Sequence, residues 1–289
     1  MATVAVVGLG IMGGAIARNL LADGIAVRGY DVDETRMDAL KPSLVATRSA
    51  GEAATGVSVA LTSLPSAKAL DETVASLLAA NCAGLIVAEL STLPIAVKEA
   101  ARDKLAAGGI ALLDCPLSGT GAQAITRDLA VYASGDRAAY DKAEPIFRRF
   151  GRVSEYLGAF GNGSKMKFVA NLLVAVHNVA SAEAMVLGMK AGLDPETIVK
   201  VIGAGAGTSR VFDLRAPLMA RRDYAPTMKI DIWQKDMAII GEFAKNLGVP
   251  TPTFTASGPV YDAAQAEGHG GEDTAAVCAV LETQTGLKR

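Results

Sequence analysis

Two polar side chains, Lys167 and Asn171, have the types and the spacing needed to move a proton at an alcohol carbon. Four residues apart on a helix, they share one face. An amine there can take the proton of a substrate hydroxyl while the carboxamide holds the oxygen, which is what alcohol oxidation requires. By spacing alone, a solvated lysine on a helix surface is the more common case, so the pair is a candidate active site and no more.

Other candidate bases fit less well. Lys165 lies about 200° round the helix from Lys167, so only one of the two can face a cleft. His177 falls in an apolar stretch typical of a core histidine, and His269 falls in a glycine-rich loop. A histidine-based dehydrogenase mechanism therefore has little support.

A glycine-rich turn is the second chemical feature: Gly8-Leu9-Gly10-Ile11-Met12-Gly13 joins a strand-like run to a helix start. Gly8 allows the tight turn, Gly10 lets the backbone approach a pyrophosphate, and Gly13 lets helix and strand pack closely. Asp31 ends the next apolar run, where its carboxylate would bind a ribose 2′-OH and repel a 2′-phosphate. The pattern predicts NAD, while Arg28 and Arg36 nearby leave NADP as the less favoured cofactor.

The elements that position these residues alternate between strand and helix up to about Gly158. This rhythm predicts an α/β fold with a mostly parallel, doubly wound sheet, whose ligands bind beyond the carboxyl ends of the strands. The loops Leu64-Pro65, Leu90–Thr92 and Pro116–Ser118 follow such ends, although each would also serve as a plain turn. The strands expected after the first two are 57–63, 84–89, 110–114, 129–133 and 153–157.

From Gly163 onward the pattern is helical. Residues 164–191 carry no proline and predict one long helix linking two domains, 1–160 and 161–289. Gly192 ends it, and Asp194-Pro195 suits the start of the next helix. Further helices are expected at 194–204, 209–222, 230–247, 253–267 and 273–286.

Composition narrows the function classes. With 289 residues, 51% hydrophobic and 20% charged, and a net charge of -2, the chain lacks the basic field that nucleic acid or an anionic membrane would need. Its three cysteines lie far apart without metal-ligand spacing, so we expect no metal site and no disulfides, in a cytoplasmic protein. Uncharged runs are too short to predict a transmembrane span.

Two further segments carry polar groups suited to ligands. Ser118-Gly119-Thr120, after a strand end, offers hydroxyl and N–H groups for a substrate carboxylate, and an N-capped turn explains it equally well. Lys235 on a late helix could reach a cofactor, although a surface ion pair with Asp236 is the default interpretation.

Taken together, these motifs resemble the β-hydroxyacid dehydrogenases, relatives of 6-phosphogluconate dehydrogenase. The resemblance covers essentially the whole chain and rests on four motifs in family order. These are Gly8–Gly13, Asp114–Gly119, Gly161–Gly163 followed by Lys167 and Asn171, and Lys235-Asp236.

The resemblance implies a Rossmann-like domain, a long interdomain helix and an all-helical C-terminal domain that forms a homodimer or homotetramer. It implies that Lys167 is the acid/base, that Asn171 is its partner, and that Ser118, Gly119 and Thr120 bind substrate. The cofactor residues it implies, beyond the glycine turn and Asp31, are Leu64, Pro65, Thr92 and Lys235. The substrate would be a small 3-hydroxy acid or its semialdehyde or keto form: hydroxyisobutyrate, glycerate or tartronate semialdehyde, or a threonate-like acid.

Two departures bear on the substrate. Thr120 stands where many relatives have a second glycine, and Ala170 where some have an asparagine. The segments 177–185 and 231–233 look closest to the branch that acts on four-carbon sugar acids. An imine reductase on the same scaffold and a non-catalytic NAD sensor are the alternatives; the lysine and Asp31 count against the first, and the intact Lys167–Asn171 pair against the second.

Overall fold

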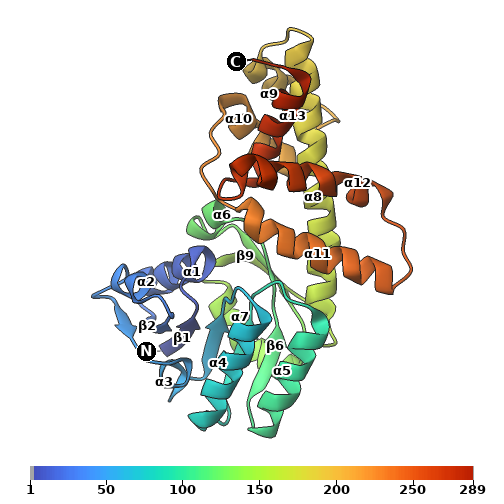
Figure 1. Cartoon of the computed structure of the whole chain (residues 1–289). Helices are drawn as coiled ribbons and strands as arrows, with labels where there is room; N and C mark the ends of the chain where they lie inside the picture. The colour runs from blue at the N-terminus through green and yellow to red at the C-terminus, as the bar shows by residue number, and fades with distance from the viewer. Residues whose placement is uncertain (1–2, 289) are drawn as a thin grey trace. The chain divides into compact units, whose positions relative to one another are not determined.

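The computed structural model describes residues 3–288 (Figure 1). The chain divides into two compact units, and the boundary along the chain falls between Lys167 and Phe168. This boundary falls inside one helix, α8 (Asn162–Lys190), rather than in a loop. The two residues of the candidate active site thus share one helix while belonging to different units.

The first unit is built on a six-stranded sheet in the order β3-β2-β1-β4-β5-β6, with every strand parallel to its neighbours. The strands are β1 (Thr3–Val7), β2 (Ala26–Tyr30), β3 (Leu44–Ala46), β4 (Val59–Thr62), β5 (Ile86–Glu89) and β6 (Ala111–Asp114). Strands β4 and β5 are buried along their whole length, as expected of a parallel sheet covered on both faces. The chain reverses its direction of travel across the sheet between β1 and β4, which is where this architecture binds ligands.

Helices cover both faces of this sheet, and each face has its own hydrophobic core. One core joins α3 (Ala50–Ala54), α4 (Ala67–Ala79) and α5 (Ile95–Ala107) to the sheet, and Figure 1 shows α4 and α5 side by side. The other joins α1 (Ile11–Ala22), α2 (Glu34–Asp38) and α7 (Arg137–Phe147). The predicted doubly wound α/β class is confirmed.

A second, smaller sheet corrects part of the prediction. The expected strands at 129–133 and 153–157 form β8 (Leu129–Ala133) and β9 (Gly151–Tyr156), which pair with β7 (Leu117–Ser118) in a separate sheet. In it, β7 runs antiparallel to β8 and β8 parallel to β9. Burial alternates along β8, which is typical of a strand with one covered face and not of a central strand of the main sheet.

The second unit is helical throughout, as predicted, and is best followed from the C-terminal part of α8. It contains α9 (Pro195–Gly203), α10 (Arg210–Arg221), α11 (Ile230–Asn246), α12 (Pro252–Ala264) and α13 (Val277–Thr285). Asp194 caps α9 by accepting a hydrogen bond from the Thr197 N–H at 2.8 Å, and Pro195 takes the first helical position. Gly192, with φ of +90°, ends α8 as expected.

Two properties of the chain bear on its class. Within residues 3–288, α8 is the one helix long and apolar enough to cross a membrane, but 44% of its most apolar window is buried and a helix of a protein core passes the same test. The three cysteines, Cys82, Cys115 and Cys278, are buried and form no disulfide within residues 3–288.

Candidate active site

The three glycines of the turn differ in how much space surrounds each of them. Gly8 has φ of +84°, and a side chain there would place its Cβ 2.2 Å from the carbonyl oxygen of Ser63. At Gly13 a Cβ would lie 1.9 Å from the Gly8 carbonyl oxygen. At Gly10 the nearest atom is the tip of Arg36, 3.6 Å away. The fold itself therefore requires Gly8 and Gly13, whereas the space at Gly10 is open to a ligand.

Helix α1 begins directly behind this open space. Gly10 is its N-cap and supplies no side-chain hydrogen bond, and Ile11, Met12 and Gly13 form its first turn. The N–H groups of a first helical turn lack intrahelical partners and favour an anion. Open space in front of an N-terminus that no side chain caps fits the pyrophosphate of a dinucleotide.

Asp31 links the end of β2 to the same turn. Its carboxylate is buried, accepts a hydrogen bond from the Leu9 N–H at 2.6 Å and another from the Asp33 N–H at 2.9 Å. Arg36 donates a third, at 3.3 Å. A carboxylate has about four acceptor sites, so one remains for a ribose hydroxyl. This environment fits the predicted contact with NAD.

The two arginines named beside Asp31 lie in different places. Arg28 donates to the carbonyl oxygens of Thr55 and Glu52 in the α3 region. Arg36 is half exposed and pairs with both Asp31 and Asp33. Arg36, unlike Arg28, therefore lies beside the Asp31 carboxylate.

The predicted cofactor loops lie at the same edge of the sheet. Leu64 and Pro65 follow β4, and Thr92 follows β5, which is the next strand. The loops are tied together because the Leu64 N–H donates to the Ser91 hydroxyl at 2.7 Å. The structure thus brings Leu64, Pro65 and Thr92 to the edge that carries the glycine turn.

The predicted substrate turn follows β6. Ser118 lies in β7, Gly119 has φ of +134°, and all three residues of Ser118–Thr120 are half-buried. The Thr120 N–H donates to the side chain of Gln123 at 3.0 Å, at the start of the short helix α6 (Gly121–Ile125). Thr120 therefore serves the helix start, which leaves Ser118 and Gly119 as the better candidates for a carboxylate.

On α8, Lys167 and Asn171 are both buried, at 6% and 3% exposed, whereas Lys165 is exposed. The Asn171 side-chain NH2 donates to Asp236 on α11 at 3.1 Å. Lys235 also pairs with Asp236, at 3.2 Å. Burial therefore separates the two lysines as the helix geometry predicted, and Lys167 is not the solvated lysine that its spacing alone would suggest.

Sequence reasoning assigned no role to several buried polar residues. Asp236 orients the Asn171 amide, and its only signal was its place in the Lys235-Asp236 motif. Lys98 on α5 is fully buried against Glu89 and Asp114, the last residues of β5 and β6. A charged residue at the end of an otherwise apolar strand, as in 84–89, was the available signal for that cluster.

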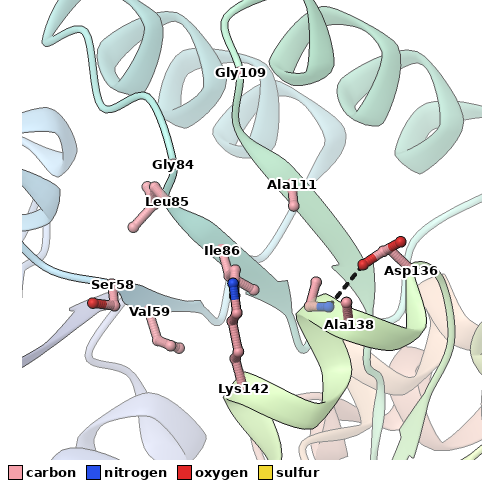
Figure 2. A pocket seen from close by; sticks show the side chains of 11 residues that line it. Ser58, Val59, Gly84, Leu85, Ile86, Gly109, Ala111, Asp136, Ala138 and Lys142 are labelled. Carbon is pink, nitrogen blue, oxygen red and sulfur yellow. Dashed lines mark hydrogen bonds between the residues drawn. The ribbon is translucent and has the colours of Figure 1, made fainter.

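A hollow elsewhere in the first unit does not belong to this site. Figure 2 shows it at the amino ends of β4, β5 and β6, the opposite edge of the sheet, with Lys142 of α7 on one side. Its one carboxylate, Asp136, accepts a hydrogen bond from the Ala139 N–H at 2.7 Å and so caps α7. The lining is otherwise mostly apolar and offers no cluster of groups for catalysis.

Comparison with known proteins identifies the family. A family model described as the NAD binding domain of 6-phosphogluconate dehydrogenase matches residues 3–158, and one described as NAD-binding of NADP-dependent 3-hydroxyisobutyrate dehydrogenase matches residues 161–281. The chain belongs to the β-hydroxyacid dehydrogenase family. It is an oxidoreductase that acts on CH–OH groups with NAD, and a small hydroxy acid is consistent with its relatives.

Individual members of the β-hydroxyacid dehydrogenase family agree over nearly the full length. An L-threonate dehydrogenase of Cupriavidus necator is 34% identical, covering 96% of this chain and 95% of its own. A 2-(hydroxymethyl)glutarate dehydrogenase of Eubacterium barkeri is 32% identical, covering 97% and 95%. A structure of Mycobacterium tuberculosis 3-hydroxyisobutyrate dehydrogenase with L-serine has a TM-score of 0.86 at 27% identity, covering 97% and 99%.

Proposed function

We propose that this enzyme oxidises a small hydroxy acid of the threonate class with NAD and that Lys167 is its proton acceptor. The observation that carries the proposal is the burial of Lys167 on α8, one turn before the equally buried Asn171. Lysine is seldom buried without a partner or a task, and here the exposed Lys165 on the same helix shows the ordinary alternative.

The residues divide the chemistry among themselves. NAD, when bound, accepts the hydride that leaves the substrate carbon. The Lys167 amine takes the hydroxyl proton and returns it in the reverse direction. The Asn171 side-chain NH2 donates one hydrogen bond to Asp236, and its second N–H donates to the substrate oxygen. As the family resemblance implies, we assign the substrate carboxylate to Ser118 and Gly119, and we assign Lys235 to the residues that bind the cofactor.

The substrate class rests on the relatives. The Cupriavidus necator relative is named for L-threonate, and the Mycobacterium tuberculosis structure contains L-serine, which is also a small hydroxy acid. A four-carbon sugar acid therefore heads the panel to be tested. Hydroxyisobutyrate, glycerate or tartronate semialdehyde, and serine are its competitors, and a ketone with an amine tests for imine reduction.

The decisive experiment measures NADH formation with this panel for the wild type, Lys167→Ala and Lys165→Ala. General acid–base catalysis contributes on the order of 100- to 10,000-fold, so Lys167→Ala should lose that much in kcat while Lys165→Ala stays near the wild type. NADH binding, followed by fluorescence, should be unchanged in both variants. Near-normal turnover of Lys167→Ala would refute the proton-transfer role. Tight NADH binding by the wild type without turnover of any acid would favour the sensor.

We also propose that the enzyme is a homodimer or homotetramer of the cytoplasm. Large apolar side chains of α8 are exposed in the single chain, including Met166, Val169, Leu173 and Leu187. Exposed apolar residues repeated along one helix are typical of a surface covered by another subunit. Light scattering coupled to size-exclusion chromatography will give the subunit number, and a monomer at micromolar concentration would contradict this part.

A further inference from the structure

A buried ammonium lies between two carboxylates at the edge of the main sheet. The Lys98 Nζ is 2.6 Å from Glu89 Oε2, 2.8 Å from Asp114 Oδ1 and 2.7 Å from the carbonyl oxygen of Ser91. The ammonium donates hydrogen bonds to Asp114 and to the Ser91 carbonyl, and it forms an ion pair with Glu89. All three charged side chains are completely buried.

The sheet register explains why a cation is needed at this place. Glu89 and Asp114 are paired residues of the neighbouring strands β5 and β6, so two buried carboxylates lie close together. Burial on its own would lower the pKa of Lys98, but the nearby Glu89 and Asp114 outweigh it and hold that pKa above its usual value. The lysine therefore stays charged and neutralises the pair.

One arm of the cluster reaches the first turn of α8. Asp114 accepts hydrogen bonds from the Ser164 N–H at 2.8 Å and from the Ser164 hydroxyl at 2.7 Å. The hydroxyl of Ser134, which contacts Asp114 at 3.3 Å, accepts the Gly163 N–H at 2.9 Å. Lys167 follows Ser164 by three residues, so this arm fixes the helical turn that carries it.

A second arm reaches the loops that follow β4 and β5. Lys98 holds the carbonyl of Ser91, and the Ser91 N–H donates to Glu89 at 3.0 Å. The Ser91 hydroxyl in turn accepts the Leu64 N–H. Leu64 and Thr92, which follows Ser91, are the proposed cofactor contacts. The same ammonium therefore also fixes the cofactor loops.

We infer that Lys98, Glu89 and Asp114 are positioning residues that hold the α8 turn bearing Lys167 in a fixed place relative to the cofactor loops. The inference rests on the proposed role of Lys167. All of its contacts lie within the first unit. A cluster that served stability alone would have no need to bond both a cofactor loop and the first turn of α8, and it would affect kcat and cofactor affinity only as far as it affects folding.

Variants that remove one arm at a time distinguish a positioning role of the cluster from a role in stability alone. Ser164→Ala should lower kcat about tenfold with the Kd for NADH changed less than about twofold, because a misplacement of about 1 Å can cost about 100-fold in rate. Ser91→Ala should raise the Kd for NADH about fivefold and leave kcat at saturation nearly unchanged, because the Leu64 N–H loses its acceptor, which typically costs about one kcal/mol. Lys98→Met should do both. If Lys98→Met fails to fold, Ser164→Ala and Ser91→Ala still test the positioning role.

Leu105→Ala is the matched control, since Leu105 is fully buried on the same helix α5, seven residues beyond Lys98. It should lower the unfolding temperature while kcat and the NADH Kd stay at wild-type values. A loss of kcat in Leu105→Ala that matches its loss of stability would overturn the inference, and so would wild-type kcat in Ser164→Ala.

Hydrogen exchange distinguishes failure of this inference from failure of the proposed function. In Asp114→Asn, amides 160–168 should exchange faster, with those of β8 as an internal reference. This measurement and the NADH titration of Ser91→Ala need no substrate, so they test both arms even if no hydroxy acid is turned over. Unchanged exchange together with an unchanged NADH Kd would refute the positioning role, whereas an inactive wild type refutes only the proposed reaction.

Discussion

Gly10 and Gly13 belong to one turn, but alanine should affect a different property at each. Gly13→Ala should destabilise the fold, whereas Gly10→Ala should weaken NADH binding. At Gly13 the new Cβ would lie 1.9 Å from the Gly8 carbonyl oxygen, more than 1 Å inside a normal contact, and both atoms are fixed by backbone. Overpacking of this kind costs about 1–3 kcal/mol or more. At about 2–4 °C per kcal/mol for a domain of this size, Gly13→Ala should lower the unfolding temperature by roughly 2–12 °C.

At Gly10 the new Cβ would have only the tip of Arg36 at 3.6 Å, and the backbone, with φ of -64°, already suits alanine. The stability of Gly10→Ala should therefore stay within about 0.5 kcal/mol of the wild type. Its methyl group would occupy the space in which the pyrophosphate approaches the start of α1. We expect the Kd for NADH to rise at least about tenfold, which corresponds to about 1.4 kcal/mol.

Urea denaturation and a fluorescence titration with NADH measure the two effects separately on each variant. If Gly10→Ala bound NADH like the wild type, the open space at Gly10 would not be the pyrophosphate site. If Gly13→Ala kept wild-type stability, the close contact between α1 and the turn would not constrain the fold.

Three further predictions concern cofactor choice and pH. Asp31→Ser removes the carboxylate that would repel a 2′-phosphate and frees Arg36, so the ratio of kcat/KM for NADP over NAD should rise about tenfold or more; an unchanged ratio would contradict the role of Asp31. Burial raises the pKa of Tyr261 to about 12, whereas a phenol in the unfolded chain titrates near 10. The protein should therefore lose about 2–3 kcal/mol of stability as the pH rises from 10 towards 12. Tyr261→Phe should lack this loss when the free energy of unfolding is measured by denaturation at pH 9–12. Burial would raise the pKa of Asp273, but Arg215 and the hydrogen bonds from Thr227 outweigh it and hold that pKa below its usual value. Its contribution is present above about pH 4 and lost as pH falls through the lowered pKa, so Asp273→Asn should flatten the acid limb seen by circular dichroism, and an identical limb would refute this assignment.

The sequence predicted the main sheet well because its buried parallel strands are continuous apolar runs with glycine or polar residues at their ends. Strands 57–63, 84–89 and 110–114 appear as β4, β5 and β6 within two residues of the expected bounds. Placing 129–133 in the same sheet was wrong, since its alternating burial belongs to a half-covered strand. Two strands, β3 and β7, were missed because two or three residues carry no detectable period.

For the candidate site, the sequence located residues that follow from local motifs and missed those that depend on tertiary contacts. The glycine turn, Asp31 and the two helix positions Lys167 and Asn171 are recognisable by their spacing. Lys98 resembles any surface lysine on a helix, since Glu89 and Asp114 become its neighbours only through strand pairing. Likewise, the contact of Asn171 with Asp236 joins positions 65 residues apart.

The three buried cysteines make the protein convenient for spectroscopic labelling. Burial raises the pKa of the Cys82 and Cys115 thiols, that of Cys115 well above its usual range, and Cys278 is completely buried and contacts Glu282 at 3.8 Å. Because the thiolate is the reactive form, maleimide dyes should modify none of them rapidly in the folded protein. A pair of cysteines introduced at exposed positions, one in each unit, could therefore be labelled without removing the native ones, and energy transfer between the dyes would report how the distance between the two units changes when NADH and a hydroxy acid bind.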